Sequence, residues 1–410
     1  MPGSSPDGRA RARDLGLAPG RLPPGPANAI TDVPGIRVGH ATVTEGAGIR
    51  TGVTAIVHDN LLRAGTLPAG LAVFNGFGKM TGSTQIAELG TIETPVLLTA
   101  TLSVFRVADA LLSYLYERLA GMGSASQGSG SQSTASQSTG EPPGTLNPVV
   151  AETNDGYLSD IWARPVTAGH VRTALDTAAA GPVAEGCAGA GTGTGALGFK
   201  AGIGTSSRIA DLAVGPVTLG VLVQANFSGE LTVLGTPVPA AHTLAAAGVT
   251  GPAEDAGPVQ DTGLAQDGGA DRSAAPPGNS CVVVLATDAP LDSRQLERLA
   301  SRAFAGMART GSDFSGHSGD YALAVSTAAA AGQAAAGREA AGAGGLVPAN
   351  DLDVLFLAAI EATEEAILNS LFKAVTTTGF RGHIRYAVPL AEVQALAGSG
   401  PQPGAGNGRM

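Results

Sequence analysis

The sequence predicts a layered protein of the α/β or α+β class, in which amphipathic helices cover β-strands. Short runs rich in Val, Leu and Thr, bounded by Gly or Pro, have the character of strands. Longer segments place apolar residues at helical spacing, and the two kinds of segment alternate along the chain. Because 43% of the 410 residues are apolar, the chain can form one large core with insertions, or roughly two or three domains.

The predicted strands combine an apolar or β-branched composition with turn residues on both sides. They are residues 52–58, 70–75, 95–99, 217–226, 281–287 and 321–327. The fifth begins with the continuous apolar run CVVVLA, which is typical of a buried strand. Periodicity alone does not determine how the strands are ordered in a sheet.

Two helices are predicted, at residues 292–309 and 352–374. In the first, apolar residues recur at i, i+3, i+7 and i+11 from Leu296, and Asp292 or Ser293 can cap the first turn. In the second, an apolar stripe begins at Leu355. Three acidic residues lie beside this stripe: Glu361, Glu364 and Glu365. We interpret them as a solvated face, with paired acid/base carboxylates as the alternative.

Four segments have the composition of flexible chain: residues 1–28, 122–146, 251–279 and 396–410. The second is almost entirely Gly, Ser, Gln and Thr, so it cannot bury enough apolar surface to offset the loss of chain entropy. We therefore expect a flexible N-terminal extension, insertions at 122–146 and 251–278, and a flexible tail.

Charge and cysteine content argue against several classes of function. The net charge is −10, and no Lys/Arg-rich run interleaved with aromatic residues could follow a phosphate backbone, so we expect no nucleic-acid partner. Cys187 and Cys281 form no Cys-x-x-Cys pair. The first 28 residues lack the apolar core of a secretory signal, and no run of ~18 apolar residues predicts a membrane span. The sequence thus predicts a cytoplasmic protein without a membrane partner.

The Gly-rich stretch 186–204 contains a formal G-x-G-x-x-G at Gly193, Gly195 and Gly198. A dinucleotide fingerprint follows a buried strand and opens a helix, and neither flank fits that pattern. Lys200 is not part of a G-K-[ST] sequence, so a phosphate-binding P-loop is absent as well. We interpret the stretch as a glycine-lined surface near a substrate backbone.

The six histidines include no His-x-x-x-His pair, so the sequence predicts no metal site. His317, in the polar loop GSDFSGHSGD, is interpreted as a solvated residue, with a catalytic base as the alternative. The Gly-x-Ser-x-Gly elbow of α/β-hydrolases is also missing.

The junction of Asn279 and Ser280 could support a catalytic reaction better than the motifs described above. A flexible segment meets a predicted strand there, and a serine stands at the start of the strand. If the peptide bond before Ser280 were broken, the new α-amino group could act as general base for the hydroxyl of the same residue. An ordinary turn is the alternative reading of Asn-Ser before a strand.

Longer motifs along the chain resemble those of the L-aminopeptidase/D-esterase (DmpA-type) family, which includes the β-aminopeptidases. They include ITDVPGIRVGHATV, ETNDGYLSDI, NSCVVVLATDAPL and SGHSGDYALAVST. The matching segments are residues 30–43, 50–56, 75–104, 152–161, 198–208, 219–227, 279–291, 315–327 and 361–371. The resemblance covers about residues 29–395, which we expect to form a single catalytic domain.

The resemblance implies a four-layer α/β/β/α sandwich of the DmpA and ornithine acetyltransferase type. It also implies that a precursor cleaves itself between Asn279 and Ser280, giving associated chains of 279 and 131 residues, here called the large and small chains. Ser280 would then be the nucleophile of the small chain, with Ser318 and Asp320 as its catalytic partners. The same resemblance assigns the oxyanion or substrate contacts to the residues matching Asn226 and Tyr157.

The implied activity is a serine aminopeptidase that releases a small N-terminal residue from short peptides, amides or esters through an acyl-enzyme on Ser280. The residue released would be D-alanine-like, glycine-like or a β-amino acid. A homotetramer without metal or organic cofactor is expected. The alternatives are a non-cleaving binding or assembly protein of the same fold, and an N-acyltransferase of the ornithine acetyltransferase type, which uses threonine as nucleophile and is disfavoured by Ser280.

Overall fold

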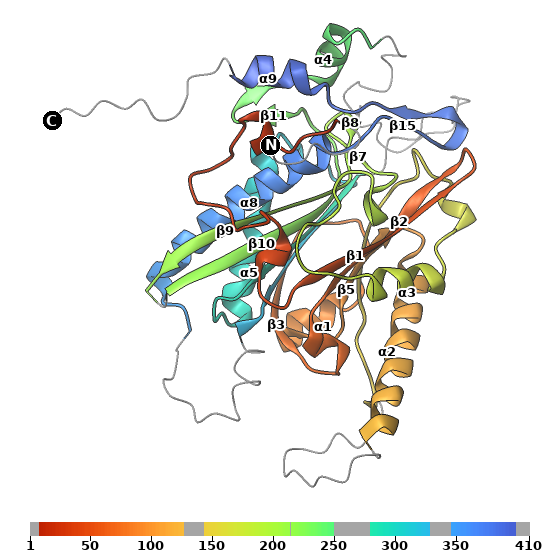
Figure 1. Cartoon of the computed structure of the whole chain (residues 1–410), viewed down its shortest axis with the longest axis vertical. Coiled ribbons are helices and arrows are strands. Elements are labelled where there is room, and N and C mark those ends of the chain that lie inside the picture. The colour runs from red at the N-terminus through yellow and green to blue at the C-terminus, as the bar shows by residue number, and fades with distance from the viewer. Residues whose placement is uncertain (1–7, 127–142, 214, 250–278, 329–345, 399–410) are drawn as a thin grey trace, which may run out of the picture.

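The computed structural model describes residues 8–126, 143–213, 215–249, 279–328 and 346–398. Two β-sheets lie face to face, and helices cover the outer side of each (Figure 1). One apolar cluster lies between the two sheets, and one further cluster lies between each sheet and its helices. This is the four-layer α/β/β/α sandwich that the sequence resemblance implies.

The smaller sheet has four strands in the order β1-β2-β5-β6. Their bounds are Arg37–Glu45 for β1, Ile49–Val57 for β2, Val96–Ala100 for β5 and Val149–Thr153 for β6. The pairings are antiparallel except for β5 with β6, which is parallel. Helices α2 (Val104–Ser126) and α3 (Ala168–Asp176) cover its outer face, where Leu111 and Leu175 share an apolar cluster with strand residues such as Val53.

The larger sheet has six strands in the order β4-β3-β14-β13-β10-β9. Their bounds are Thr91–Ile92 for β4, Leu67–Gly76 for β3, Gly319–Ser326 for β14, Ser280–Thr287 for β13, Gly215–Asn226 for β10 and Ile203–Leu212 for β9. Only β13 with β14 is a parallel pair among these six. Helices α5 (Ser293–Ser301), α6 (Ala303–Arg309) and α8 (Leu352–Phe372) cover its outer face.

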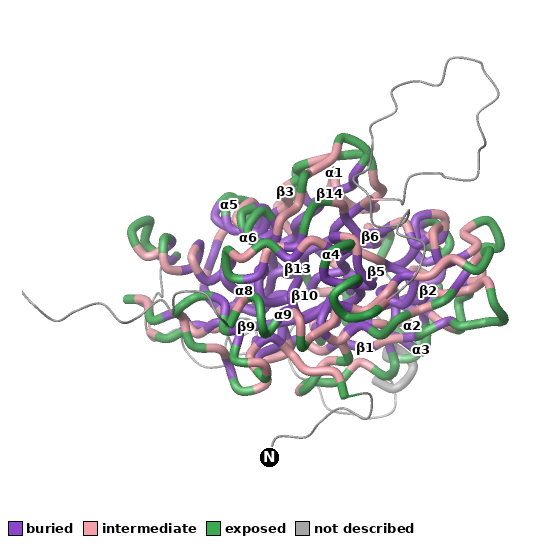
Figure 2. Tube along the Cα trace, turned by 90° about the horizontal axis from the view of Figure 1, so that it is seen from above, coloured by how far each residue is buried: buried purple, intermediate pink, exposed green. Residues whose placement is uncertain are grey.

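Strand β13 lies in the interior of this sheet, and each of its residues is buried (Figure 2). Cys281, Val283 and Leu285 join the cluster on the helix side, whereas the alternating Val282 and Val284 join the cluster between the sheets. Burial of both faces explains the continuous apolar run in the sequence, because successive side chains of a strand point to opposite faces.

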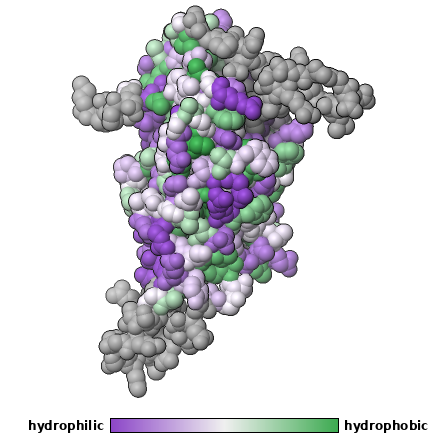
Figure 3. Space-filling view, turned by 90° about the vertical axis from the view of Figure 1, so that its right-hand side faces the viewer, coloured by the Kyte–Doolittle hydropathy of each residue, from purple (hydrophilic) through white to green (hydrophobic). Residues whose placement is uncertain are grey.

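Shorter elements connect these layers. They are the helices α1 (Ser83–Leu89), α4 (Ala240–Ala246) and α9 (Leu390–Gly398), and the strands β7 (Gly195–Ala196), β8 (Phe199–Lys200), β11 (Thr232–Val233), β12 (Thr236–Pro237), β15 (Thr377–Thr378) and β16 (Ile384–Arg385). Within the described ranges, each helix is too short or too polar to cross a membrane. On the face shown in Figure 3, hydrophobic residues form small groups interrupted by hydrophilic ones.

The predicted helix at 292–309 is two helices in the structure. Asp292 caps α5 as expected, because its carboxylate accepts a hydrogen bond from the backbone N–H of Gln295 at 2.7 Å. The helix ends at Ser301, and Arg302 separates it from α6. The backbone N–H of Arg302 bonds to Leu299, three residues back, so the chain tightens there before the second helix begins.

The interpretation of Glu361, Glu364 and Glu365 as a solvated face is wrong. These residues are only 2%, 6% and 0% exposed, because α8 is enclosed by β9, β10, α6 and the N-terminal segment. Arg208 of β9 is fully buried and donates to the Glu365 carboxylate at 2.8 Å. A buried carboxylate is tolerated only with such partners, and they come from segments distant in sequence.

The prediction of a flexible N-terminal extension is wrong for residues 8–28. Ala12 and Leu17 belong to the main apolar cluster. Arg11 pairs with Glu185 at 2.8 Å and Arg13 with Glu365 at 2.9 Å. Arg11 and Arg13 are therefore the counter-ions of buried carboxylates.

The other segments predicted as flexible fall largely outside the described residues. Helix α2 continues through residues 122–126, residues 143–146 are described, and α9 includes residues 396–398. The remaining parts of these predicted segments, 127–142, 251–278 and 399–410, lie outside the described ranges.

Candidate active site

Ser280 is the first residue of β13 and lies where three neighbouring strands meet. Across the antiparallel pairing with β10 it faces Asn226, the last residue of that strand. On the other side, the parallel register aligns Cys281 with Asp320 at the start of β14. The strand order therefore brings together residues 226, 280 and 320, and Ser280 is only 2% exposed.

The Asn279–Ser280 linkage is held in place from both sides. The side-chain amide of Asn279 donates to the hydroxyls of Ser228 at 2.9 Å and Ser315 at 2.8 Å. The hydroxyl of Ser280 donates to the carbonyl oxygen of Asn279. In the intact chain the hydroxyl of Ser280 thus lies against the carbonyl group of the preceding residue.

Ser318 and Asp320 form a buried pair beside this linkage. The hydroxyl of Ser318 donates to Oδ1 of Asp320 at 2.7 Å, and both side chains are almost fully buried. Burial raises the pKa of Asp320, while the hydrogen bonds from Ser318 and Asn75 act in the opposite direction. The structure therefore places both residues of the GHSGD motif next to the candidate nucleophile.

The amide of Asn226 has a fixed orientation. Its nitrogen donates to the carbonyl of Asn154 at 2.9 Å, and its oxygen accepts from the backbone N–H of Gly195 at 3.1 Å. With both ends of the amide held, the nitrogen is identified as the donor end of this side chain, on the residue that pairs with Ser280.

Two glycines that the sequence analysis did not select allow this close packing. A Cβ atom on Gly319 would lie 2.5 Å from the backbone of Gly78 and 3.2 Å from Oγ of Ser280. A Cβ atom on Gly78 would lie 2.9 Å from the ring of Tyr321. Gly78 lies in the motif NGFGK and Gly319 in HSGD, and both motifs belong to segments that resemble the family. Only the fold shows that these two glycines touch.

Glu152 is a second carboxylate of this region that the sequence analysis did not select. Its Oε1 accepts from the backbone N–H of Lys79 at 3.0 Å and would be 3.4 Å from a Cβ on Gly78. Its Oε2 is buried and has no hydrogen-bond partner among the described residues. Burial raises the pKa of this carboxyl, and the ammonium of Lys79 opposes that shift. A donor from a bound molecule could satisfy the second oxygen.

Tyr157 packs against His383 and Arg385. Its ring stacks on His383 with centroids 4.4 Å apart, and the guanidinium of Arg385 lies 4.2 Å from the ring centroid. Arg385 in turn lies against Gly195, whose N–H holds Asn226. The structure thus connects Tyr157 to the site through Arg385 and Gly195.

The Gly-rich stretch 186–204 contains a 3-10 turn and short strands and leads into β9, so it does not open a helix as a dinucleotide site does. His317 is exposed, and its ring lies 5.5 Å from that of Phe77. Among the described residues, no group of three or more His, Cys, Asp or Glu side chains could hold a metal ion.

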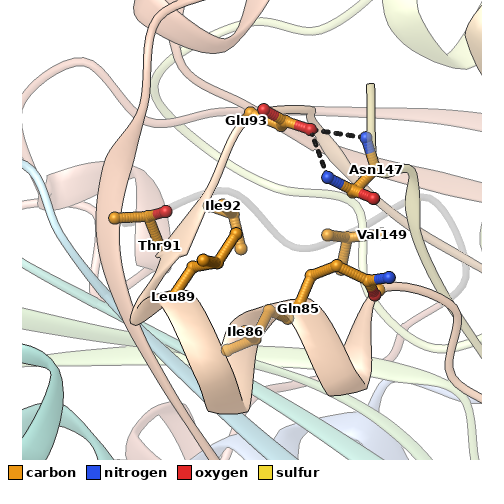
Figure 4. Close-up of a pocket in the computed structure, with 9 residues that line it drawn as sticks. Gln85, Ile86, Leu89, Thr91, Ile92, Glu93, Asn147 and Val149 are labelled. Atoms are coloured by element: carbon orange, nitrogen blue, oxygen red, sulfur yellow. Dashed lines mark hydrogen bonds between the residues drawn. The ribbon is translucent and has the colours of Figure 1, made fainter. Parts of the chain in front are cut away.

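A shallow pocket lies near the start of β6, at the opposite end of the strand from Glu152 (Figure 4). Ile86, Leu89 and Ile92 line it, and Glu93 accepts two hydrogen bonds from Asn147 at its rim. None of the residues discussed above for the active site lines this pocket.

A buried strand that begins with a hydroxyl residue, at the centre of an α/β/β/α sandwich, defines the class of hydrolases with an N-terminal nucleophile. Comparison with known proteins supports this assignment to the class. The model of Peptidase family S58 matches residues 28–385. Beta-peptidyl aminopeptidase BapA of Sphingosinicella microcystinivorans is 38% identical over 402 residues, which cover 94% of this chain and 91% of that protein.

Two solved structures extend the likeness. The beta-aminopeptidase of a Burkholderia species is 37% identical, with a TM-score of 0.72, and the match covers 96% of this chain and 100% of that one. The L-aminopeptidase D-Ala-esterase/amidase of Ochrobactrum anthropi, a prototype of the serine aminopeptidases and a variant of the Ntn hydrolase fold, is 34% identical. Its TM-score is 0.74, and the match covers 94% and 97% of the two chains.

The chain therefore belongs to peptidase family S58. It is a self-processing serine aminopeptidase that acts on peptides, and the family, fold and activity implied by the sequence motifs are confirmed.

Proposed function

We propose that the chain cleaves itself between Asn279 and Ser280, and that Ser280 then serves as the nucleophile that removes the N-terminal residue of short peptides. The observation that supports this most directly is the pairing of Ser280 with Asn226 at the end of a buried strand, beside Ser318 and Asp320. It joins a nucleophile, an amide donor and a buried serine–carboxylate pair at one place.

Self-cleavage begins with attack of the Ser280 hydroxyl on the carbonyl carbon of Asn279. The C–N bond breaks, the hydroxyl proton passes to the released nitrogen, and the Asn279 acyl group is left as an ester on Oγ. Water then hydrolyses this ester, giving a carboxylate at Asn279 and a free amine and hydroxyl on Ser280. The hydrogen bond between the hydroxyl and the Asn279 carbonyl supports this first step.

In turnover, the α-amine of Ser280 takes the hydroxyl proton as Oγ attacks the substrate carbonyl. Asn226 donates to the developing oxyanion, a contribution of about 3 kcal/mol for a single well-placed donor. Ser318, oriented by Asp320, relays the proton between the Ser280 amine and the leaving amine. Water then hydrolyses the acyl-enzyme and regenerates Ser280.

We assign Glu152 as the residue that binds the free amino group of the substrate. An aminopeptidase must recognise an ammonium group, and the buried Oε2 of Glu152 has no hydrogen-bond donor among the described residues. The nearby Gly78 contacts Gly319, which lies against Ser280. A charge-assisted hydrogen bond to this oxygen would hold the substrate with its first carbonyl near the nucleophile.

The names of two relatives support β-amino acids as the residues released. The third relative is named for L-aminopeptidase and D-Ala-esterase activity, so D-alanine- and glycine-like residues are the second choice. A panel of β-, D- and L-aminoacyl amides tests the order, and chelation should leave turnover unchanged. Equal rates across the panel would contradict a preference for small or β-amino acids.

A denaturing gel and N-terminal sequencing test the processing step. Wild-type protein should give two chains of 279 and 131 residues with a new N-terminus at Ser280, and Ser280→Ala should remain a single chain of 40.3 kDa. Hydrolysis of aminoacyl amides by an intact wild-type chain would contradict the proposed mechanism.

We also propose a homotetramer. The exposed aromatic residues Phe77 and Trp162, 65% and 79% accessible, support association because large apolar side chains at a surface are common contact points. Light scattering after size exclusion should give about four times 40.3 kDa. A mass of a single processed protomer would contradict it.

A further inference from the structure

Strand β3 carries an extra residue next to the active site. It pairs with β14 in a regular antiparallel register from Ala69 to Val73, and Val73 faces Tyr321. The next pair along is Asp320 with Asn75, so Phe74 is left without an opposite residue. This is a β-bulge, a feature that commonly redirects a side chain near an active site.

The bulge decides which side chain meets Asp320. In an unbroken antiparallel register Asp320 would face Phe74, and Asn75 would face Gly319, with its side chain on the other side of the sheet. With the bulge, Asn75 lies opposite Asp320. The ring centroids of Phe74 and Phe314 lie 4.3 Å apart, so the bulge packs against the loop that precedes β14.

The amide nitrogen of Asn75 donates to three acceptors. One is Oδ2 of Asp320 at 3.0 Å, and the others are the carbonyls of Phe314 at 3.1 Å and Ser315 at 3.2 Å. Asp320 thus receives a side-chain donor on each oxygen, Ser318 on Oδ1 and Asn75 on Oδ2, and the backbone N–H of Cys281 is a further donor to this carboxylate. Rotation of the carboxylate would break one of these bonds.

Ser315 connects the same amide to the scissile bond. Its carbonyl accepts from Asn75 and from the backbone N–H of Ser318 at 3.0 Å, and its hydroxyl accepts from the side chain of Asn279 at 2.8 Å. Asn75 therefore holds two features at once: the Ser318–Asp320 pair and the loop that positions the residue before the cleavage point.

We propose that Asn75 is a positioning residue for both reactions of this enzyme, which fixes the Asp320 carboxylate and the 314–315 carbonyls so that Ser318 and Asn279 are held against Ser280. This inference rests on the proposed roles of Ser280, Ser318 and Asp320. It extends the site to a strand that lies 245 positions away from Asp320 in the sequence.

The charge on Asp320 gives the inference a distinctive signature. The titratable groups around this carboxylate are Asp313 in the same loop, the Cys281 thiol on β13 and Tyr321 on β14, in addition to the Ser280 amine after cleavage. Burial already raises the pKa of Asp320, and the Asn75 bond opposes that rise. Loss of this donor should therefore move the acidic limb of activity to higher pH.

The test compares Asn75→Leu, Asn75→Asp and the matched control Asn147→Leu. Asn147 also donates its side-chain amide to a carboxylate, Glu93, at 2.7 Å, but at the remote pocket. Each variant is purified, examined by thermal unfolding, and followed for self-cleavage on a denaturing gel. The mature proteins are assayed with an aminoacyl amide from pH 5 to 9.

For Asn75→Leu we expect slower self-cleavage and a fall in kcat of roughly 10- to 100-fold with little change in KM, the usual effect of losing a hydrogen bond to a charged group. The acidic limb of kcat/KM should move up by about one pH unit. Asn75→Asp places a second carboxylate against Asp320 and should also move the acidic limb of kcat/KM to higher pH. At pH values below that limb the variant should keep partial activity, because the new side chain is protonated there and can donate a hydrogen bond to Asp320. Asn147→Leu should keep the wild-type rate and profile.

Wild-type pH profiles and rates in both Asn75 variants would overturn the inference. Misfolding of both Asn75 variants while Asn147→Leu folds would also overturn it, because Asn75 would then have a purely structural role. If Asn75→Leu alone fails to fold, the profile of Asn75→Asp decides. Failure of the proposed function is recognised separately, since wild-type protein would then show no new N-terminus at Ser280.

Discussion

Asn226 and Ser280 face each other at the end of an antiparallel register that continues, pair by pair, to Leu219 and Thr287. The donor proposed for the oxyanion and the proposed nucleophile are therefore fixed by the same ladder of backbone hydrogen bonds. The proposed cleavage before Ser280 would place them in different chains, because Asn226 would remain in the large chain and Ser280 would begin the small one. The sheet keeps their relative position after the covalent connection is broken.

Replacing the amide of Asn226 tests the oxyanion role. Asn226→Leu should lower kcat by about 100- to 1,000-fold, the usual cost of one oxyanion donor, with a smaller effect on KM. Steady-state kinetics on mature protein measures this. Asn147→Leu again provides a control for loss of an amide at a distant site. A change confined to KM would assign Asn226 to substrate binding instead.

The close approach of Gly319 to Gly78 predicts a sharp effect of one methyl group. Gly319→Ala should abolish self-cleavage, because the new Cβ would lie 2.5 Å from the Gly78 backbone and 3.2 Å from the Ser280 hydroxyl. Gly316→Ala, in the same loop, is the matched control, since a Cβ there meets no atom within 4 Å. Gel analysis of both variants makes the comparison. Normal processing of Gly319→Ala would show that this contact does not constrain the site.

The buried carboxyl of Asp155 predicts a pH dependence of stability. Burial raises its pKa from 3.8 to about 7, although hydrogen bonding with the Thr51 hydroxyl and with the residue's own backbone N–H acts in the opposite direction. Between these values the unfolded chain releases its proton first. The free energy of unfolding should therefore fall as pH rises from about 4 to 7, in total by an amount on the order of 4 kcal/mol.

Urea unfolding of the single-chain Ser280→Ala protein at pH 5 and pH 8 measures this effect. Asp155→Asn on that background should lose part of the dependence and be the more stable protein at pH 8. Glu185, whose pKa burial also raises to about 7, is unchanged in both proteins and contributes equally to each. Identical pH slopes in the two proteins would contradict the role of Asp155.

The ion pair of the N-terminal segment predicts a stability difference between two arginines. Arg13→Ala should lower the free energy of unfolding by about 1 to 3 kcal/mol, because it removes one charged partner of the fully buried Glu365. Arg208 remains as the other charged partner and limits the loss. Arg37→Ala removes an exposed pair with Asp59 and should cost less than about 1 kcal/mol. Both are measured by urea unfolding on the Ser280→Ala background. Equal costs would mean that the segment contributes no more than a surface pair.

Local composition predicted the strands that are buried and apolar. The strand expected at 281–287 begins one residue earlier, at Ser280, and the helix expected at 352–374 is α8. Strand β9 was not predicted, because its sequence IGTSSRIADL carries Arg208 and several small polar residues in buried positions. Their partners, such as Glu365, come from a helix more than a hundred positions away, and no local pattern reveals them.

The sequence by itself determined the family, the layered fold and the serine at the start of the central strand, because these depend on long ordered motifs and on the apolar run that follows Ser280. Only the tertiary structure decided that Asn75 faces Asp320 and that Glu361, Glu364 and Glu365 are buried. A bulge and a strand order set those contacts, and both arise from pairing between segments that are distant along the chain.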